Sequence, residues 1–209
     1  GGTELMQDAL EARLPKGLLN EFQIIASRLR GIDPERKSIL WLHDLAEDPE
    51  VQHLSDPRGR ERFDKLVFVS HWQFATYNKV LGIPYGESIV LKNAIEPIEN
   101  HVKQKDGPIR LIYHTTPHRG LDVLVAVYER LSEVWKDKVH LDVYSSFKIY
   151  GNEQRDAAFQ EIFDKCKEHD HITYHGTVSN AEIRKALEEA HIFAYPSTWQ
   201  ETSCIAGIE

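Results

Sequence analysis

The sequence contains only two cysteines, Cys166 and Cys204, in 209 residues, and it has no apolar run of about 18 residues. Two cysteines cannot build the disulfide framework of small secreted proteins, so a reducing, cytoplasmic compartment is predicted. Without a long apolar run, no transmembrane helix is expected. The net charge of −8 is opposite in sign to that of most proteins that bind phosphate backbones, so no nucleic-acid partner is predicted.

Common motifs for nucleotides and metals are also missing. No two glycines stand two positions apart, which weakens a dehydrogenase interpretation, and the phosphate loop G-x-x-x-x-G-K-[ST] is absent. The D-x-D motif, with which many nucleotide-sugar enzymes bind a metal, has no counterpart. His169 and His171 have the alternating spacing of a strand, which makes a poor metal site. The sequence therefore predicts no metal site and no cofactor.

Segments with the apolar spacing of strands alternate with segments that have the apolar spacing of helices. With 41% hydrophobic and 28% charged residues, the composition is that of a globular protein rather than a disordered one. The alternation predicts an α/β fold with parallel sheets flanked by helices. The predicted strands span residues 22–27, 38–43, 65–70, 88–93, 109–115, 139–146, 171–176 and 191–197. The predicted helices span residues 72–82, 121–135, 153–169 and 180–190, and the apolar face of the second consists of Leu121, Leu124, Val125, Tyr128, Leu131 and Val134.

One stretch interrupts this alternation of predicted strands and helices. Residues 94–108, AIEPIENHVKQKDGP, contain two prolines, a glycine and many polar residues, without a periodic apolar face. Such a segment is typical of a linker between two domains. We therefore predict an N-terminal domain at residues 1–100 and a C-terminal domain at residues 101–209.

The end of the chain, FAYPSTWQETSCIAGIE, has features of a ligand-binding turn. The last predicted strand ends at Pro196, and Thr202 or Ser203 is a good N-cap for a helix that follows. The first turn of that helix would offer free N–H groups at Thr202, Ser203 and Cys204, together with the positive end of the helix dipole, to a phosphate. Ligands of α/β sheets bind beyond the carboxyl ends of the strands, where this segment is expected.

Two glutamates, Glu201 and Glu209, flank the predicted phosphate site. Eight residues along a helix leave an offset of about 80°, so the two carboxylates would lie on roughly the same side. A carboxylate can accept two hydrogen bonds from a vicinal diol, and the pair therefore suits a sugar nucleotide, with one carboxylate at the sugar and the other at the ribose. The alternative is that both are ordinary solvent-facing glutamates.

The segment PSTWQETSCIAGIE resembles the E-x7-E signature of the retaining GT-B glycosyltransferases of family 4, also called the glycosyl transferases group 1 family. Similar stretches follow in family order through the chain. GGTELMQDAL resembles the glycine-rich turn and helix after the first strand, ILWLHD a strand ending in a histidine, and TPHRGLDVLVAVYERL the diphosphate-contacting segment. The resemblance implies GT-B architecture, with two Rossmann-like domains facing across a cleft, the first on the acceptor side and the second binding the nucleotide sugar.

The resemblance also implies roles for residues of the nucleotide side. Arg119 stands where the family usually has a lysine, and its forked guanidinium can grip diphosphate oxygens. His114 occupies the place of an arginine and is a weaker donor ligand, because histidine is only partly charged near neutral pH. Glu201 would orient the donor sugar and Glu209 the ribose.

On the acceptor side, His43 would touch the donor sugar or its acceptor; the alternative is that it simply closes a strand with a backbone hydrogen bond. Gly1 and Gly2 are either loop residues that approach the donor or simply the start of the chain. The turn before the second domain has Asn93-Ala94 where the family has Asn-Gly, so a left-handed backbone is not expected there.

The implied reaction moves a sugar from a UDP- or GDP-sugar to a sugar, a lipid-linked sugar or a small molecule, with retention, without a metal and without a covalent nucleophile. Peripheral membrane contact is compatible with these partners. Two other classes stay open: another GT-B-type enzyme, such as a sugar-nucleotide epimerase or a phosphorylase, and a non-catalytic nucleotide-sugar-binding protein.

Relative to the family, the chain is expected to be incomplete at both ends, lacking the first strand and the C-terminal part. A parallel sheet that lacks a strand exposes backbone donors and acceptors, which favours pairing with another chain. The expectation is that these 209 residues alone are inactive and dimerise through the exposed edges.

Overall fold

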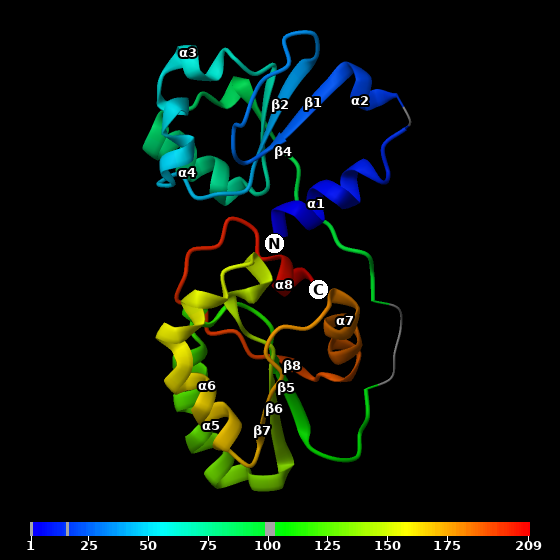
Figure 1. Ribbon diagram of the computed structural model, residues 1–209, viewed down its shortest axis with the longest axis vertical. Helices are drawn as coiled ribbons and strands as arrows, with labels where there is room; N and C mark the ends of the chain where they lie inside the picture. The colour runs from blue at the N-terminus through cyan, green and yellow to red at the C-terminus, as the bar shows by residue number, and fades with distance from the viewer. Residues whose placement is uncertain (1, 16, 99–102) are drawn as a thin grey trace. The chain divides into compact units, whose positions relative to one another are not determined.

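The computed structural model describes residues 2–15, 17–98 and 103–209 (Figure 1). The chain forms two compact units. Unit 1 comprises Gly1–Ala94 with Glu201–Ile205, and unit 2 comprises Ile95–Gln200 with Ala206–Glu209. The predicted boundary between residues 100 and 101 lies outside the described residues, as does Gly1.

Unit 1 is built on a parallel sheet in the order β1-β2-β3-β4. The strands are β1 (Phe22–Ala26), β2 (Lys37–Leu42), β3 (Lys65–Phe68) and β4 (Ser88–Val90). The α-helices of the unit are α1 (Gly2–Glu11), α2 (Leu18–Glu21), α3 (Pro57–Arg60) and α4 (His71–Leu81), and the 3₁₀ helices are η1 (Pro49–Ser55) and η2 (Tyr85–Glu87).

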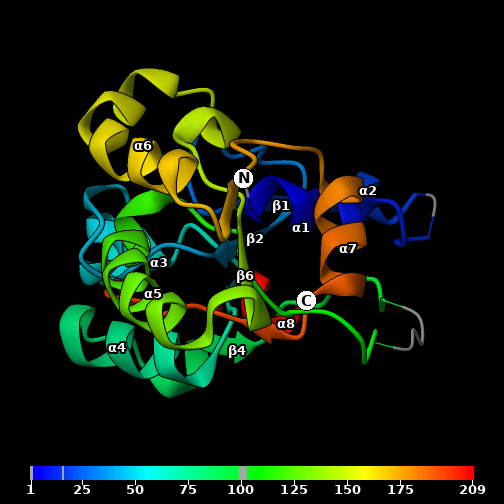
Figure 2. The ribbon, with the colours of Figure 1, turned by 90° about the horizontal axis from the view of Figure 1, so that it is seen from below.

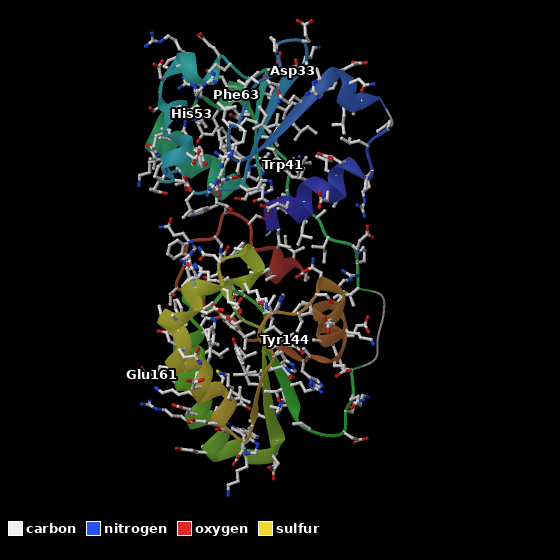
Figure 3. The ribbon with its side chains drawn as sticks, in the orientation of Figure 1. Asp33, Trp41, His53, Phe63, Tyr144 and Glu161 are labelled. Carbon is white, nitrogen blue, oxygen red and sulfur yellow. The ribbon has the colours of Figure 1, made fainter. Side chains whose placement is uncertain are left out.

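Helices cover both faces of this sheet because apolar residues occupy both sides of its strands. Leu40 and Leu42 of β2 are fully buried against α4 and η1, in a core that includes Tyr77. The alternate residue Trp41, labelled in Figure 3, packs on the other face with Met6 of α1. A strand with two buried faces has a nearly continuous apolar sequence, as ILWL in β2 does.

Unit 2 has a second parallel sheet, in the order β7-β6-β5-β8. The strands are β5 (Ile109–Tyr113), β6 (Val139–Val143), β7 (Ile172–Tyr174) and β8 (Ile192–Phe193). The α-helices α5 (Leu121–Trp135), α6 (Gln160–Glu168) and α7 (Asn180–Glu189) flank it, with α5 and α6 on one side and α7 on the other (Figures 1 and 2). The 3₁₀ helices are η3 (Pro117–Arg119), η4 (Lys136–Lys138), η5 (Phe147–Tyr150) and η6 (Glu153–Phe159).

The predicted fold class is confirmed: the protein is α/β, with parallel sheets flanked by helices. Each predicted strand overlaps an observed strand, and the predicted helix at 121–135 matches α5. The predicted helix at 153–169 is α-helical only from Gln160, because its first half is the 3₁₀ helix η6. In that half the Asp156 carboxylate accepts hydrogen bonds from the Phe147 N–H and the Ser146 hydroxyl, which ties the segment to the loop after β6.

The predicted apolar face of α5 is wrong at its C-terminal end. Val134 is 76% exposed, whereas Ser132 is buried. At about 100° per residue, Ser132 falls on the stripe of Leu121 and Val125, while Val134 points to the opposite side. The Ser132 hydroxyl is compatible with burial because it donates to the Glu129 carbonyl at 2.8 Å.

The sheet face toward α7 is more polar than the face toward α5. Asp142 of β6 is 5% exposed and accepts hydrogen bonds from Arg110 at 2.8 Å and 3.2 Å. Its other oxygen lies 2.9 Å from Nε2 of His175, and Arg110 also pairs with Glu189 of α7. Such a buried carboxylate is tolerated only when it is paired and hydrogen-bonded.

Within the described ranges, none of the helices combines the length and the apolarity that crossing a bilayer would need.

A buried glutamine, Gln73, holds the carboxyl ends of β2 and β3 together. Its side-chain oxygen accepts from the Val69 N–H at 2.9 Å, and its amide nitrogen donates to the carbonyls of Leu42 at 3.2 Å and Asp44 at 2.9 Å. We expect Gln73→Leu to lower the free energy of unfolding by about 2–4 kcal/mol, because it leaves buried backbone groups without hydrogen-bond partners. Urea denaturation measures this loss.

The matched control is Gln160→Leu, which removes an exposed glutamine whose side chain donates to Asp164 at 2.7 Å. Its effect should stay within about 0.5 kcal/mol. Equal losses in the two variants would contradict the role given to Gln73.

Candidate functional site

The predicted site residues are distributed over both units. Unit 1 holds Gly2, His43, Glu201, Thr202, Ser203 and Cys204, and unit 2 holds His114, Arg119 and Glu209. Each group is described within its own unit.

His43 directly follows β2, and its backbone is fixed on both sides. Its N–H donates to the Ser27 hydroxyl at 2.9 Å, and the Gln73 side chain bonds the carbonyls of the residues before and after it. Ser27 itself has a left-handed backbone with φ 60° and is 4% exposed, and its N–H donates to the Trp41 carbonyl. A non-glycine residue in that conformation is uncommon and stores strain that the surrounding bonds must hold.

The His43 imidazole is neutral at physiological pH. Burial lowers its pKa to about 4, and the negative charge of Glu4 opposes that shift only in part. The ring lies 4.6 Å from the Trp41 ring, and its Nε2 is buried without a hydrogen-bond partner among the described residues. A buried, unpaired nitrogen of this kind can bond a ligand hydroxyl in either direction, depending on the tautomer.

The predicted helix start at Thr202 or Ser203 is wrong. The helix α8 spans only Ile205–Ile208, and the Thr202 hydroxyl donates to the His43 carbonyl at 2.7 Å instead of capping a helix. The Thr202 carbonyl in turn accepts from the Ser70 hydroxyl at 2.5 Å. Residues 202–204 therefore form a segment attached to the ends of β2 and β3, and a single helical turn offers no N-terminal anion site there.

Gly2 is the first residue of α1 and not part of a turn. A Cβ atom at this position would lie 2.9 Å from Cδ1 of Ile205, so the end of the Ile205 side chain would have to shift to admit it. Ile205 belongs to the same apolar cluster as Met6. In this structure Gly2 permits packing, and its predicted contact with a donor stays a prediction.

In unit 2, the segments after β5 and β8 touch through their backbones. A Cβ atom on Gly120 would lie 2.2 Å from the Pro196 carbonyl oxygen, and Gly120 has φ 104°. Only glycine fits both the space and the conformation. Arg119, the last residue of η3, is thereby held beside the Pro196 turn, and its N–H donates to the Thr116 carbonyl at 3.2 Å.

His114 and Glu209 are brought together at the end of β5. Nδ1 of His114 lies 3.9 Å from Oε2 of Glu209, and the His114 side chain is 3% exposed. Burial lowers the pKa of His114 to about 4, so the predicted partial positive charge is wrong. Burial also raises the pKa of Glu209, and Arg184 opposes that shift. Glu209 follows a single-turn α8 and does not lie two turns inside a helix as predicted.

Buried polar atoms gather at the carboxyl ends of β5 and β6, and of these the sequence interpretation missed the two hydroxyls. The hydroxyls of Thr116 and Ser145, in residues that are 4% and 2% exposed, and Nε2 of His114 have no hydrogen-bond partner in the described parts of the chain. An unsatisfied buried polar group costs about 1–3 kcal/mol, so such a set requires an explanation. Their position in the sequence could have indicated them, because each follows a strand and so lies at the sheet edge where α/β proteins bind ligands.

An aromatic contact beside Arg119 was also missed. The ring of His118 stacks on Phe147 at 5.2 Å and meets the edge of Trp199 at 5.0 Å. These rings come from the segments after β5, β6 and β8, and Trp199 is 49% exposed. They form one wall at the carboxyl edge of the unit 2 sheet.

Among the residues that the structure describes, no three histidine, cysteine or acidic side chains gather in a way that could hold a metal ion. In unit 2 the candidate residues are thus one arginine, the neutral His114, buried hydroxyls and the Glu209 carboxylate. Such groups can bind an anion and a polyol by hydrogen bonds and one permanent positive charge.

Solved structures share this fold at low sequence identity. A glycosyltransferase from Rickettsia africae ESF-5 matches with a TM-score of 0.60 and 15% identity over 95% of this chain and 56% of that one. The apo form of the lipopolysaccharide outer core galactosyltransferase WaaB matches with a TM-score of 0.51 and 10% identity, over 82% of this chain and 45% of that one. This chain thus spans about half the length of the structures it resembles.

No curated protein matches the sequence. A family model does: the one described as "Glycosyl transferases group 1" matches residues 95–209. The match covers more than half of the chain and includes the whole carboxyl edge of the unit 2 sheet, with Arg119, the Pro196 turn and both glutamates. The chain belongs to the glycosyl transferases group 1 family.

Proposed function

We propose that the protein transfers a sugar from a nucleotide-diphosphate sugar to an acceptor, with retention of configuration and without a metal. The observation that carries this proposal is the set of buried, unpartnered polar groups beside Arg119, in the unit matched by the family model. UDP- and GDP-sugars are the proposed donors, and a sugar, a lipid-linked sugar or a small molecule is the proposed acceptor.

Arg119 is the group proposed to neutralise the diphosphate. Negative charge grows on the leaving diphosphate as the sugar departs, and a fixed guanidinium stabilises that charge more in the transition state than in the ground state. The backbone contact of Gly120 with Pro196 holds this segment in place, so little reorganisation is needed during the reaction. Because His114 is neutral, its contribution would be a hydrogen bond rather than a charge.

The carboxylates have proposed roles at the two ends of the donor. Glu209 would accept hydrogen bonds from the ribose hydroxyls, and Glu201 would orient the transferred sugar. The raised pKa of Glu209 fits this role, because a partly desolvated carboxylate gains from a diol that replaces its lost water. His43 would contact the transferred sugar or its acceptor through the unpartnered Nε2.

The N–H groups of Thr202, Ser203 and Cys204, together with Gly2, complete the proposed donor-binding set. Since α8 begins only at Ile205, the first three would act as single donors of a turn and not through a helix dipole.

The direct test is incubation of the protein with labelled UDP- and GDP-sugars and a panel of acceptors, followed by analysis of the products. Transfer to an acceptor supports the proposal. Conversion of the donor sugar to its epimer, formation of a sugar phosphate, or binding without turnover would each replace it with one of the competing classes.

The first prediction at this site concerns Arg119. Arg119→Ala should weaken UDP or GDP binding by about 1.5–3 kcal/mol, the usual contribution of a hydrogen bond to a charged group. Isothermal titration calorimetry measures the effect, and uridine or guanosine affinity should change much less. Arg130→Ala, on the solvent-exposed side of α5, is the matched control and should leave both affinities unchanged. Equal losses for nucleoside and diphosphate would contradict the assignment.

The second prediction separates the two glutamates. Glu209→Gln should weaken UDP or GDP binding about tenfold, because the ribose loses a charged acceptor. Glu201→Gln should leave nucleotide affinity intact and lower the turnover of the sugar nucleotide. Titration calorimetry and product formation read these effects independently, and the reverse pattern would show that the order along the donor is wrong.

The third prediction follows from the neutral histidines. His43 and His114 both have a pKa of about 4, so neither gains a proton between pH 8 and pH 6. The affinity for a UDP- or GDP-sugar should therefore stay within about twofold over this range, since the diphosphate diester does not titrate there either. A tightening of about tenfold as the pH falls through the ordinary histidine range would mean that one histidine binds the donor as a cation.

A further inference from the structure

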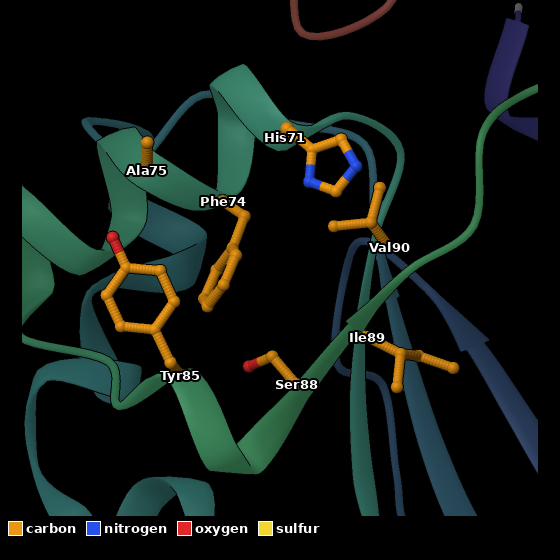
Figure 4. Close-up of a pocket in the computed structure, with 7 residues that line it drawn as sticks. All are labelled: His71, Phe74, Ala75, Tyr85, Ser88, Ile89 and Val90. Atoms are coloured by element: carbon orange, nitrogen blue, oxygen red, sulfur yellow. The ribbon is translucent and has the colours of Figure 1, made fainter.

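A pocket of about 490 Å³ lies on the flank of β4 in unit 1 (Figure 4). Its volume falls within the range of small-molecule sites, about 300–1,000 Å³. Its walls come from α4, η2 and β4, and none of its lining residues belongs to the predicted donor-binding set.

The pocket exists because β4 is a three-residue strand at the edge of the sheet. The pairing of Leu66 with Ser88 and of Phe68 with Val90 turns Ser88 and Val90 toward the face that α4 covers. The buried aromatic row of that face continues from Phe68 to Phe74, with ring centres 5.0 Å apart. Beyond Phe74 the side chains no longer fill the space between α4 and the edge strand.

Two aromatic rings form the apolar wall. Phe74 is 8% exposed and anchored in the core, whereas Tyr85 is 67% exposed. Their centres are 4.9 Å apart at 76°, so the edge of one ring meets the face of the other. An aromatic face carries partial negative charge and attracts the weakly positive C–H groups of a ligand.

A buried hydroxyl provides the second, independent observation. Oγ of Ser88 is inaccessible to solvent and has no hydrogen-bond partner within the described residues. In Figure 4 it is directed into the space between Phe74 and Tyr85, and the His71 imidazole faces the same space from the other end. Burying a hydroxyl without a partner is unfavourable, and a ligand hydroxyl at this place would remove that cost.

The charges of the wall restrict the ligand further. The lining contains no aspartate, glutamate, lysine or arginine, so an ionised ligand would lose water without meeting a counter-charge. A pure hydrocarbon would leave the Ser88 hydroxyl unpaired. What fits is an uncharged molecule with a C–H face on one side and hydroxyl groups around its edge.

We infer that this pocket binds a neutral pyranose ring, as a carbohydrate site additional to the proposed donor site. One C–H face of the sugar lies on the exposed ring of Tyr85, with Phe74 at its side, a sugar hydroxyl bonds Oγ of Ser88, and another bonds the His71 imidazole. The inference does not depend on the proposed transfer reaction, because the pocket would bind the sugar in the absence of any nucleotide.

The test uses neutral methyl pyranosides, with gluco, galacto, manno and N-acetylglucosamine configurations, titrated without nucleotide and followed by amide NMR shifts. At least one should bind saturably, with shift changes concentrated at His71, Tyr85 and Ser88. Tyr85→Ala should weaken binding about tenfold or more, because it removes the exposed ring, and Ser88→Ala about fivefold, because it removes one hydrogen bond. Tyr150→Ala, which removes a tyrosine of unit 2 that is 51% exposed, is the matched control and should leave the affinity unchanged.

Four outcomes would overturn the inference. They are the absence of saturable binding by every methyl pyranoside, unchanged affinity in both Tyr85→Ala and Ser88→Ala, equal affinity for n-hexanol, and equal affinity for methyl glucuronate. Circular dichroism of each variant checks its fold. If Tyr85→Ala is unfolded, the pyranoside affinity of Ser88→Ala decides the test. Arg119→Ala should leave pyranoside binding intact, so failure of this site and failure of the proposed donor site are separately visible.

Discussion

The contact between Gly120 and the Pro196 carbonyl is the constraint on which the candidate site in unit 2 depends. Two strands that are neighbours in the sheet, β5 and β8, each end in a turn, and the turns can meet only if one of them has no side chain. Gly120 supplies that space and also the positive φ with which η3 changes into α5. Arg119 and Trp199 lie within a few residues of this contact, so their positions follow from it.

In unit 1, side chains rather than a glycine fix the segments that follow the strands. Parallel strands leave unpaired backbone groups where they end, and these groups need partners once they are buried. Around His43, the partners are the hydroxyls of Ser27 and Thr202 and the amide of Gln73. The result is a backbone fixed by hydrogen bonds on both sides of the His43 imidazole, and such a backbone holds a side chain more accurately than a loop does.

Much of the fold could be predicted from the sequence because its signals are local. Runs such as ILWL and LVFV mark strands buried on both faces, and the 3.6-residue period of residues 121–135 marks α5. Val134 was misplaced by extending an apolar pattern without following the helix geometry. The polar network of Asp142 was not predicted, since it joins residues from three strand regions and α7 that are far apart in sequence.

For the candidate site too, features with a local sequence signal could be predicted, and features that depend on contacts between distant residues could not. The turn after β8 could be predicted from its residue types, and its functional role stays a prediction. The start of α8 could not be, because Thr202 is a good helix cap by propensity, yet its hydroxyl bonds a carbonyl 159 residues earlier in the chain. Likewise, no local pattern shows that the His114 side chain is only 3% exposed, because its burial results from tertiary packing. That burial is what keeps the imidazole neutral.

The neutral histidines in turn determine how an anion could be bound by a protein of net charge −8. Two protonated imidazoles beside carboxylates would form internal ion pairs that a ligand would have to break. Buried and uncharged, both keep hydrogen-bonding capacity, and His114 does so without competing for Glu209, whose own pKa is raised by burial. Among the predicted donor-site residues of unit 2, the permanent positive charge is then that of Arg119, because arginine stays charged at every physiological pH. Recognition of a diphosphate would depend on the placement of one guanidinium, and that placement is set by a glycine against a carbonyl oxygen.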